Sequence, residues 1–514
     1  MPSDTAAPER SPAPDPAGPA PDAALVPAAV AETHSAVVVF LGDRAYKVKK
    51  RVDLGFLDFR LRPAREAACH REVALNRRLA PDVYLGVADV VGADGEPCDH
   101  LVVMRRMPAE RRLATLVCAG GDVDDELWRL AHVMASFHAR AERSAAADRA
   151  AGRDALAGRW AHNTAEMLAL PRSCLDPGAV RAVDRRAQRY LAGREPLFRA
   201  RVAGGRACDG HGDLLADDIF CLDDGPRVLD CLEFDAALRR DDVLADVAFL
   251  AMDLERLGRP DLGARFLEAY REHADDAWPA SLAHHHVAYR AQVRAKVAAI
   301  RAAQGSGDSA VEARDLLAMA RRHLEAGTVR LVLVGGLPGT GKTTLATTLA
   351  DDLGATCLHS DEVRKELAGL APDRSAAAAF GEGIYRPETT AATYDEMARR
   401  ARTALAHGES VVLDASFTDD DHRREARAVA DATAADLVEL RCAAPASVAE
   451  ARILRRLARG TDASDATPAI AAALAATAAP WPEATVVDTT GDREVARDRA
   501  RAAVLDTGGE RSGG

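Results

Sequence analysis

The stretch that decides the fold is Arg330–Leu345, RLVLVGGLPGTGKTTL. Its first part, Leu331 to Val334, is an apolar run of strand length, and the residues after it fit the pattern G-x-x-x-x-G-K-[ST] at every fixed position. The sequence therefore predicts a strand, a glycine-rich loop and a helix that begins near Lys342. A plain glycine-rich turn is the alternative, but the strand–loop–helix context that the motif requires is present.

The chemistry of this loop follows from its backbone. Glycines let successive N–H groups turn onto phosphate oxygens, and the N-terminus of the next helix adds a partial positive charge. We expect Lys342 to reach the β- and γ-phosphates of ATP and the Thr343 hydroxyl to hold Mg²⁺. The predicted nucleotide-binding residues are Gly336, Leu337, Pro338, Gly339, Thr340, Gly341, Lys342, Thr343 and Thr344.

The residues after the loop alternate between short apolar runs and helical segments. This alternation predicts an α/β domain over 328–507, with a doubly wound parallel sheet. The apolar runs lie at 355–358, 410–413, 436–442 and 485–487.

Three side chains near the ends of these strands are candidates for phosphoryl transfer, because the carboxyl ends of parallel strands face the site. Asp361 is placed as the general base for a substrate hydroxyl, and Arg364 could hold the acceptor. Asp414 ends an apolar strand and is expected to help position Mg²⁺. For both carboxylates the alternative is a structural role at a strand end.

Four arginines share one predicted helix ahead of the segment GTDASDATP. Arginines at this point could close over the transferring phosphoryl group as a lid, and we assign Arg452 and Arg456 to nucleotide binding. A solvated basic helix face is the alternative for the set, which is Arg452, Arg455, Arg456 and Arg459.

The N-terminal half shows a different pattern. The runs VVVFL and AYKVKK flank the turn Gly42-Asp43 and predict a β-hairpin with Lys47 and Lys49 on one strand face. A helix over 66–79, which carries Glu72, and strands over 84–91 and 101–104 complete a small mixed lobe. Helical segments then dominate from residue 125 to about 326.

A polar constellation interrupts this helical region. His211-Gly212-Asp213 is followed seventeen residues later by Asp230, across a short hairpin whose two strands are expected over 219–222 and 227–232. Phosphotransfer needs one carboxylate that accepts the proton of the attacking hydroxyl and a second that holds Mg²⁺. Lys47 could supply positive charge to the phosphates, and Glu72 could fix that lysine. Lys49 and Glu66 are the competing assignments, and a turn-capping Asp213 is the structural alternative.

Residues 30 to 325 resemble the aminoglycoside phosphotransferase-like kinases through ETHSAVVVFLGDRAYKVKK, LGFLDF, HREVALNRRLAPD and HGDL…VLDCLEF. The resemblance implies a bilobal protein-kinase-like fold, with Asp213 as the catalytic base and Asp230 as a Mg²⁺ ligand. In that family an asparagine supplies a further Mg²⁺ ligand, and its position here is Asp218. A carboxylate suits Mg²⁺ by type, but it adds negative charge beside the triphosphate.

The C-terminal part resembles the P-loop kinases that include gluconate kinase-like enzymes, polynucleotide 5′-kinases and zeta-type toxins. The whole chain resembles a bacterial fusion family of the two modules. The expected organisation is a disordered tail over 1–27, a kinase-like domain over 28–325 (small lobe 28–107, helical lobe 108–325), the P-loop kinase domain over 328–507 and a second tail over 508–514.

Composition limits the class of protein. The chain has 514 residues, 48% of them hydrophobic, and a formal net charge of −12. The charge argues against a general nucleic-acid or anionic-membrane binder, and no apolar run reaches the length of a membrane span. With no basic and apolar leader at its start and no C-x-x-C pair, the sequence predicts a cytoplasmic protein.

These observations predict an ATP- and Mg²⁺-dependent kinase whose acceptor is a hydroxyl of a small molecule, with a second kinase-like site in the N-terminal half. One alternative is a P-loop kinase or ATPase regulated by a catalytically weak, ligand-sensing N-terminal half. The other is a nucleic-acid end kinase. Oligomeric state and acceptor carry no readable signal in the sequence.

Overall fold

The computed structural model describes residues 29–32, 35–53, 58–371, 382–459 and 466–506. The tails expected at 1–27 and 508–514 lie outside these residues. The chain divides into two compact units, 1–107 and 108–514, and each is described by itself. The expected division into a kinase-like domain of two lobes and a P-loop kinase domain stays a prediction.

The first unit is an antiparallel sheet covered by one helix. The expected hairpin is present, with Val38 opposite Lys47 across its two strands. The predicted helix is α1, which begins at Arg62 because Pro63 suits the first helical turn. The sheet order is β1-β2-β3-β5-β4, and α1 packs on β4 and β5. The elements are β1 (Ala29–Glu32), β2 (Ala36–Leu41), β3 (Arg44–Lys49), α1 (Arg62–Asn76), β4 (Tyr84–Val91) and β5 (Pro97–Arg105).

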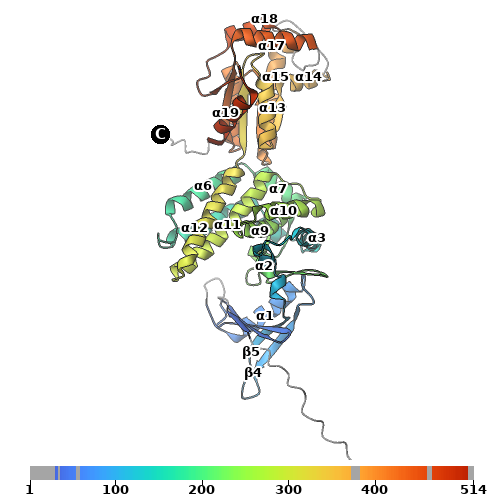
Figure 1. The fold of residues 1–514 in the computed structure, drawn as a ribbon, viewed down its shortest axis with the longest axis vertical. Helices are drawn as coiled ribbons and strands as arrows, with labels where there is room; N and C mark the ends of the chain where they lie inside the picture. Colours follow the sequence, from blue (N-terminus) through green and yellow to red (C-terminus); the bar gives the residue numbers. More distant parts are fainter. Residues whose placement is uncertain (1–28, 33–34, 54–57, 372–381, 460–465, 507–514) are drawn as a thin grey trace, which may run out of the picture. The chain divides into compact units, whose positions relative to one another are not determined.

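The second unit begins with a mainly helical region. At its centre α9 is buried along most of its length, and α11 and α12 run side by side (Figure 1). Two short antiparallel pairs interrupt the helices, β6 (Ala207–Asp209) with β9 (Arg240–Asp242) and β7 (Ile219–Leu222) with β8 (Gly225–Val228). The helices are α2 (Leu113–Cys118), α3 (Asp124–Arg140), α4 (Ala145–Ala150), α5 (Arg153–Ala169), α6 (Pro177–Ala192), α7 (Glu195–Ala203), α8 (Ala236–Arg239), α9 (Val243–Arg256), α10 (Pro260–Ala274), α11 (Ala280–Ala303) and α12 (Gly307–Ala326).

The rest of the second unit is the predicted α/β region. Its five strands are all parallel, in the order β11-β12-β10-β13-β14, so the expected doubly wound sheet is confirmed. Apolar residues of α13 and α19 pack on this sheet in one core (Figure 1). The elements are β10 (Arg330–Gly335), α13 (Lys342–Leu353), β11 (Thr356–His359), α14 (Ser360–Leu367), α15 (Pro387–Ala406), β12 (Val411–Asp414), α16 (Asp420–Ala432), β13 (Asp436–Ala443), α17 (Ala446–Arg459), α18 (Pro468–Thr477), β14 (Thr485–Asp488) and α19 (Arg493–Asp506).

The two parts of the second unit contact each other directly. Arg194, just before α7, donates to the Thr433 carbonyl at 2.7 Å, and the Ser281 hydroxyl of α11 donates to the Gly408 carbonyl at 2.7 Å. Three residues link the end of α12 to the start of β10. Across the described ranges, every helix is too short or too polar to span a bilayer.

Candidate functional site

The glycine-rich loop follows the central strand β10, as its sequence predicts. Gly336, Gly339 and Gly341 have φ values of 144°, 79° and 85°, in the region that favours glycine. The next residue, Lys342, begins α13. The loop therefore has the backbone conformation and the helix N-terminus that the motif requires for phosphate binding.

Glycine at 339 is required for a second reason, which leads to a testable prediction. A Cβ there would lie 2.4 Å from the Ala449 carbonyl oxygen. Gly354, at the C-terminal end of α13, the helix that follows the loop, has φ 58° and open space around it. We expect Gly339→Ala to weaken ATP binding at least tenfold, because the loop must shift away from α17. Gly354→Ala is the matched control, with a stability loss of about 1 kcal/mol and unchanged affinity. Nucleotide titrations of both variants check this, and equal affinities would contradict it.

Arg452 braces the loop from α17. Its guanidinium donates to the Thr489 carbonyl at 2.6 Å and to the Gly339 carbonyl at 3.5 Å. This arginine, predicted as part of a lid, therefore lies directly against the phosphate loop. Arg456 donates to the Ala466 carbonyl at 2.8 Å. The side chain of Arg459 and the residues 460–465, where the predicted lid continues, lie outside the described residues.

Lys342 and Thr343 occupy the first turn of α13. In the part of the chain that the structure describes, Lys342 has no hydrogen bond and no ion pair, and Thr343 is exposed. The Lys342 ammonium group is therefore available to phosphate oxygens, and the Thr343 hydroxyl is available to a cation.

Asp414 ends β12, the strand beside β10, and lies opposite Val334. The carboxylate is 4% exposed, and its Oδ2 accepts a hydrogen bond from His359 Nδ1 at 2.8 Å. Its Oδ1 is buried with no hydrogen-bond partner among the described residues. A buried carboxylate oxygen of this kind fits a hydrated Mg²⁺ ion.

His359 is a site residue that the sequence interpretation missed. It ends β11, so the parallel register brings it beside Asp414. The hydrogen bond to Asp414 is the main cause that raises the pKa of His359 to about 10, which makes it an imidazolium at neutral pH. The available signal was its place at the end of an apolar run, two residues before Asp361.

The predicted base and the predicted acceptor-binding residue contact each other. Asp361 lies in the first turn of α14, and its Oδ1 accepts from Arg364 Nη1 at 2.7 Å. Arg364 is 7% exposed, and its guanidinium lies 4.9 Å from the centre of the Tyr385 ring. Arg364 thus holds the Asp361 carboxylate in place, and both flank the same strand end.

In the first unit, Glu72 of α1 contacts both candidate lysines. Its carboxylate lies 2.8 Å from Lys47 Nζ and 2.6 Å from Lys49 Nζ. Lys47 keeps 12% of its side chain exposed, whereas Lys49 is fully buried. Lys47 is therefore the lysine of the two that solvent or a ligand can reach. Glu66, the competing glutamate, lies instead beside His100, at 3.4 Å.

In the second unit, Asp246 of α9 holds the loop that carries Asp213. Its two carboxylate oxygens accept from the backbone N–H groups of His211 at 2.7 Å and Gly212 at 2.8 Å. Burial alone would raise the pKa of Asp246, but the hydrogen bond from His138 and the loop amides outweigh it and hold that pKa far below its ordinary value. The sequence interpretation missed Asp246, although an aspartate inside the apolar run VLADVAFL is a usable signal.

The surroundings of Asp213 change its acidity. Burial raises the pKa of Asp213 to about 6, while Arg294 and Arg290 of α11 oppose the shift and Asp230 adds to it. Arg290 is itself buried and donates to the Ala245 carbonyl at 3.0 Å. A carboxyl group with this pKa can exchange a proton near neutral pH.

The two predicted metal ligands of this half come from the segment around β7 and β8. Asp218 precedes β7, and its carbonyl accepts from the Leu229 N–H at 2.9 Å. The strand expected over 227–232 is wrong in its bounds, because β8 ends at Val228 and Asp230 adopts a left-handed φ of 60°. Asp230 therefore lies in irregular backbone after the strand and not on it.

Fold and loop geometry together define the class of protein. It is a protein in which a five-stranded parallel sheet carries a phosphate-binding loop after its central strand, and in which an antiparallel sheet and a mainly helical region precede that sheet in the chain. A family model described as an AAA domain matches residues 331–481.

Uncharacterised proteins of Mycobacterium tuberculosis and Mycobacterium bovis are each 44% identical to the chain over 465 residues, 90% of this chain and 93% of theirs. The chain belongs to the same family as these mycobacterial proteins. Among solved structures, a choline/ethanolamine kinase family protein of Mesorhizobium loti is 16% identical with a TM-score of 0.39, over 59% of this chain and 90% of that one. A gluconokinase of Sinorhizobium meliloti is 16% identical with a TM-score of 0.26, over 35% of this chain and 92% of that one.

Proposed function

We propose that this protein is an ATP-dependent kinase that transfers the γ-phosphate to a hydroxyl group of a small molecule at the P-loop. The observation that carries the proposal is the pairing of two features at one edge of the sheet. Lys342 presents a cation without a competing carboxylate among the described residues, and Asp414, opposite Val334 near the end of β10, presents a buried oxygen that has no partner among them. A phosphate with its metal ion needs this combination.

The side chains divide the work of the reaction. The loop amides and Lys342 bind and orient the phosphates, and Arg452 keeps the loop in this shape. Thr343 and Asp414 would hold Mg²⁺, which neutralises developing charge on the phosphates when bound. Asp361 accepts the proton of the attacking hydroxyl, and its ion pair with Arg364 keeps the carboxylate oriented.

The test is a screen of the full-length protein with γ-labelled ATP and Mg²⁺ against sugars, aminoglycosides, nucleosides and single-stranded oligonucleotides. Label transferred to a small hydroxyl compound supports the proposal. Label on oligonucleotide ends would favour the nucleic-acid alternative. Release of phosphate without any labelled acceptor would leave an ATPase and overturn the kinase assignment.

We further propose a second phosphotransfer centre in the N-terminal half, with Asp213 as base and Asp218 and Asp230 as Mg²⁺ ligands. In the first unit, Lys47, held by Glu72, is the candidate for a phosphate contact. Because a base acts when deprotonated and the pKa of Asp213 is about 6, transfer at this centre should rise as pH increases from 5 to 7 and then level off. The transfer rate that remains in Lys342→Ala protein, followed from pH 5 to 7, measures this pH dependence. The further substitution Asp213→Asn should abolish that remaining rate.

The same experiment distinguishes a second active centre from the alternative in which the N-terminal half is a ligand-sensing domain. Asp218 replaces the expected asparagine and adds negative charge beside a bound triphosphate. If Lys342→Ala protein shows no Asp213-dependent transfer with any acceptor, the N-terminal half acts as a regulatory domain and not as a second enzyme.

A further inference from the structure

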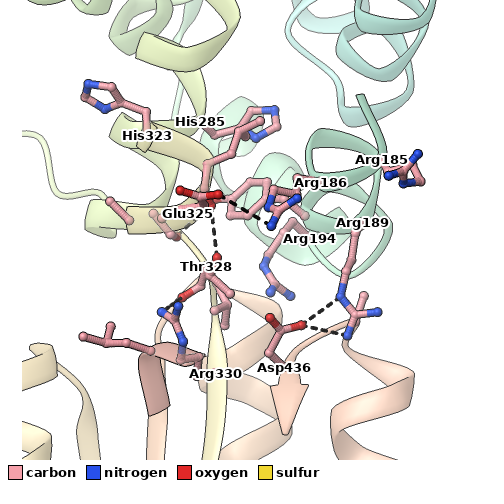
Figure 2. A pocket seen from close by; sticks show the side chains of 18 of the residues that line it. Arg185, Arg186, Arg189, Arg194, His285, His323, Glu325, Thr328, Arg330 and Asp436 are labelled. Atoms are coloured by element: carbon pink, nitrogen blue, oxygen red, sulfur yellow. Dashed lines mark hydrogen bonds and ion pairs between the residues drawn. The ribbon is translucent and has the colours of Figure 1, made fainter. Parts of the chain in front are cut away.

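A cavity of about 820 Å³ lies inside the second unit, where its helical region meets the parallel sheet (Figure 2). Residues of α6, α11 and the end of α12 form one wall, and Arg330 and Asp436 form the other. These two residues begin β10 and β13, whereas the phosphate loop follows the end of β10. Since the sheet is parallel, the cavity lies at the edge opposite the nucleotide site, roughly 20 Å away along the strand.

The cavity is lined by more positive than negative side chains. Three carboxylates contribute, Glu325, Asp436 and Asp506, against five arginines. Glu325 pairs with Arg186 at 3.5 Å, and Asp436 pairs with Arg189 at 2.9 Å. The five arginines are Arg185, Arg186, Arg189, Arg194 and Arg330, so the lining carries two excess positive charges.

Two of these arginines are buried without a carboxylate partner. Arg194 is 1% exposed and Arg330 is 9% exposed, and among the described residues both donate only to backbone carbonyls. The Nε–H of each is buried with no acceptor in the part of the chain that the structure describes. Figure 2 shows Arg194 and Arg189 reaching from the helical region toward Arg330 and Asp436. A buried guanidinium without a counter-ion is costly, and an anion in the cavity would offset that cost.

One wall of the cavity adds an aromatic surface and a neutral donor. The Tyr190 ring stacks on the His285 ring with centroids 4.5 Å apart, and the Arg194 guanidinium lies 5.3 Å over Tyr190. His285 Nε2 accepts from Trp160 Nε1 at 3.1 Å, so in the neutral ring Nδ1 carries the proton, and Nδ1 is buried without a partner. A planar surface beside unpaired cations suits an organic molecule that bears a charged group.

We propose that this cavity binds a small phosphorylated molecule, a phosphomonoester, at a site separate from the two phosphotransfer centres. A phosphomonoester carries close to two negative charges at neutral pH, which matches the excess positive charge of the lining. The guanidinium groups of Arg194 and Arg330 suit phosphate oxygens, and the Tyr190–His285 wall suits the organic part. The volume lies within the range of small-molecule sites. The proposal does not depend on which half of the chain is catalytic.

The test is calorimetric titration of the full-length protein with ribose 5-phosphate, with ribose as the uncharged control. The phosphate loop also attracts phosphates, so the titration uses Lys342→Ala protein and, separately, wild-type protein saturated with Mg²⁺ and a non-hydrolysable ATP analogue. We expect ribose 5-phosphate to bind in both cases and ribose in neither. If ribose 5-phosphate binds neither Lys342→Ala protein nor the wild-type protein saturated with the ATP analogue, the phosphate belongs to the nucleotide sites and the proposal is overturned.

Variants of the lining locate the binding. Arg330→Met in the same Lys342→Ala background should weaken ribose 5-phosphate binding at least tenfold, because it removes a buried cation. Arg181→Gln, an equal charge change on α6 away from the cavity, should alter it less than twofold. Should Arg330→Met fail to fold, Arg185→Gln at the exposed rim should weaken binding at least threefold. Unchanged affinity in the folded lining variants would overturn the proposal.

Discussion

Replacing Lys342 with alanine should reduce phosphoryl transfer at the P-loop by about a hundredfold or more. The ammonium group is the cation that the described structure leaves for the β- and γ-phosphates, and removing one preorganised charge contact from a transfer site has effects of this size. The measurement is the steady-state rate of label transfer from γ-labelled ATP, together with ATP affinity. Both should fall, because the contact holds the bound nucleotide and becomes stronger as negative charge develops in the transition state.

The matched control for this variant lies on the same helix. Thr348→Ala removes a half-buried side chain whose hydroxyl, among the described residues, donates only to the Thr344 carbonyl one turn earlier, at 2.9 Å. It should leave the rate unchanged, and thermal melting of both variants verifies that they fold. Equal rates in Lys342→Ala and wild-type protein would show that the P-loop is not the working centre.

Replacing Asp246 with alanine should destabilise the second unit by about 3 to 5 kcal/mol, the cost of breaking a buried charged network. Its carboxylate accepts from two backbone amides of the Asp213 loop and lies 3.1 Å from His138 Nε2. Because its folded pKa is depressed, this stabilisation is present above the unfolded pKa of about 3.9 and is lost as pH falls toward the folded value. Urea unfolding at pH 7 measures the loss.

Hydrogen exchange gives a local readout of the same substitution. The amides of His211 and Gly212 should lose protection in Asp246→Ala more than amides of the parallel sheet do. Asp261→Ala is the control, since that aspartate pairs with Arg259 and Arg265 at the exposed surface, where ion pairs add little stability. Similar unfolding midpoints for the two variants would contradict the assigned role of Asp246.

The elements that the sequence predicted well are those with a local code. The hairpin around Gly42, the phosphate loop and the strands of the parallel sheet each follow from a run of neighbouring residues and their turn chemistry. The bounds of β8 were less predictable, because the left-handed backbone conformation at Asp230 is set by its surroundings and not by the residues of the strand.

Contacts between distant residues were not predictable in the same way. His359 and Asp414 are 55 positions apart and meet because β11 and β12 are neighbours in register. Lys47 and Lys49 alternate onto one strand face, as predicted, but only the packing of α1 decides that Glu72 contacts both and that Lys47 keeps the exposed position.

The sequence by itself determined that the chain carries a phosphate loop on a parallel sheet, after a half with the residues of a kinase-like fold. These properties follow from short motifs and periodicity, which depend on neighbouring residues. Only the tertiary structure decided that Asp246 holds the Asp213 loop, that Asp414 keeps one buried oxygen without a partner and that Arg194 and Arg330 face one cavity. Burial and electrostatic pairing are properties of packed elements, so no local pattern specifies them.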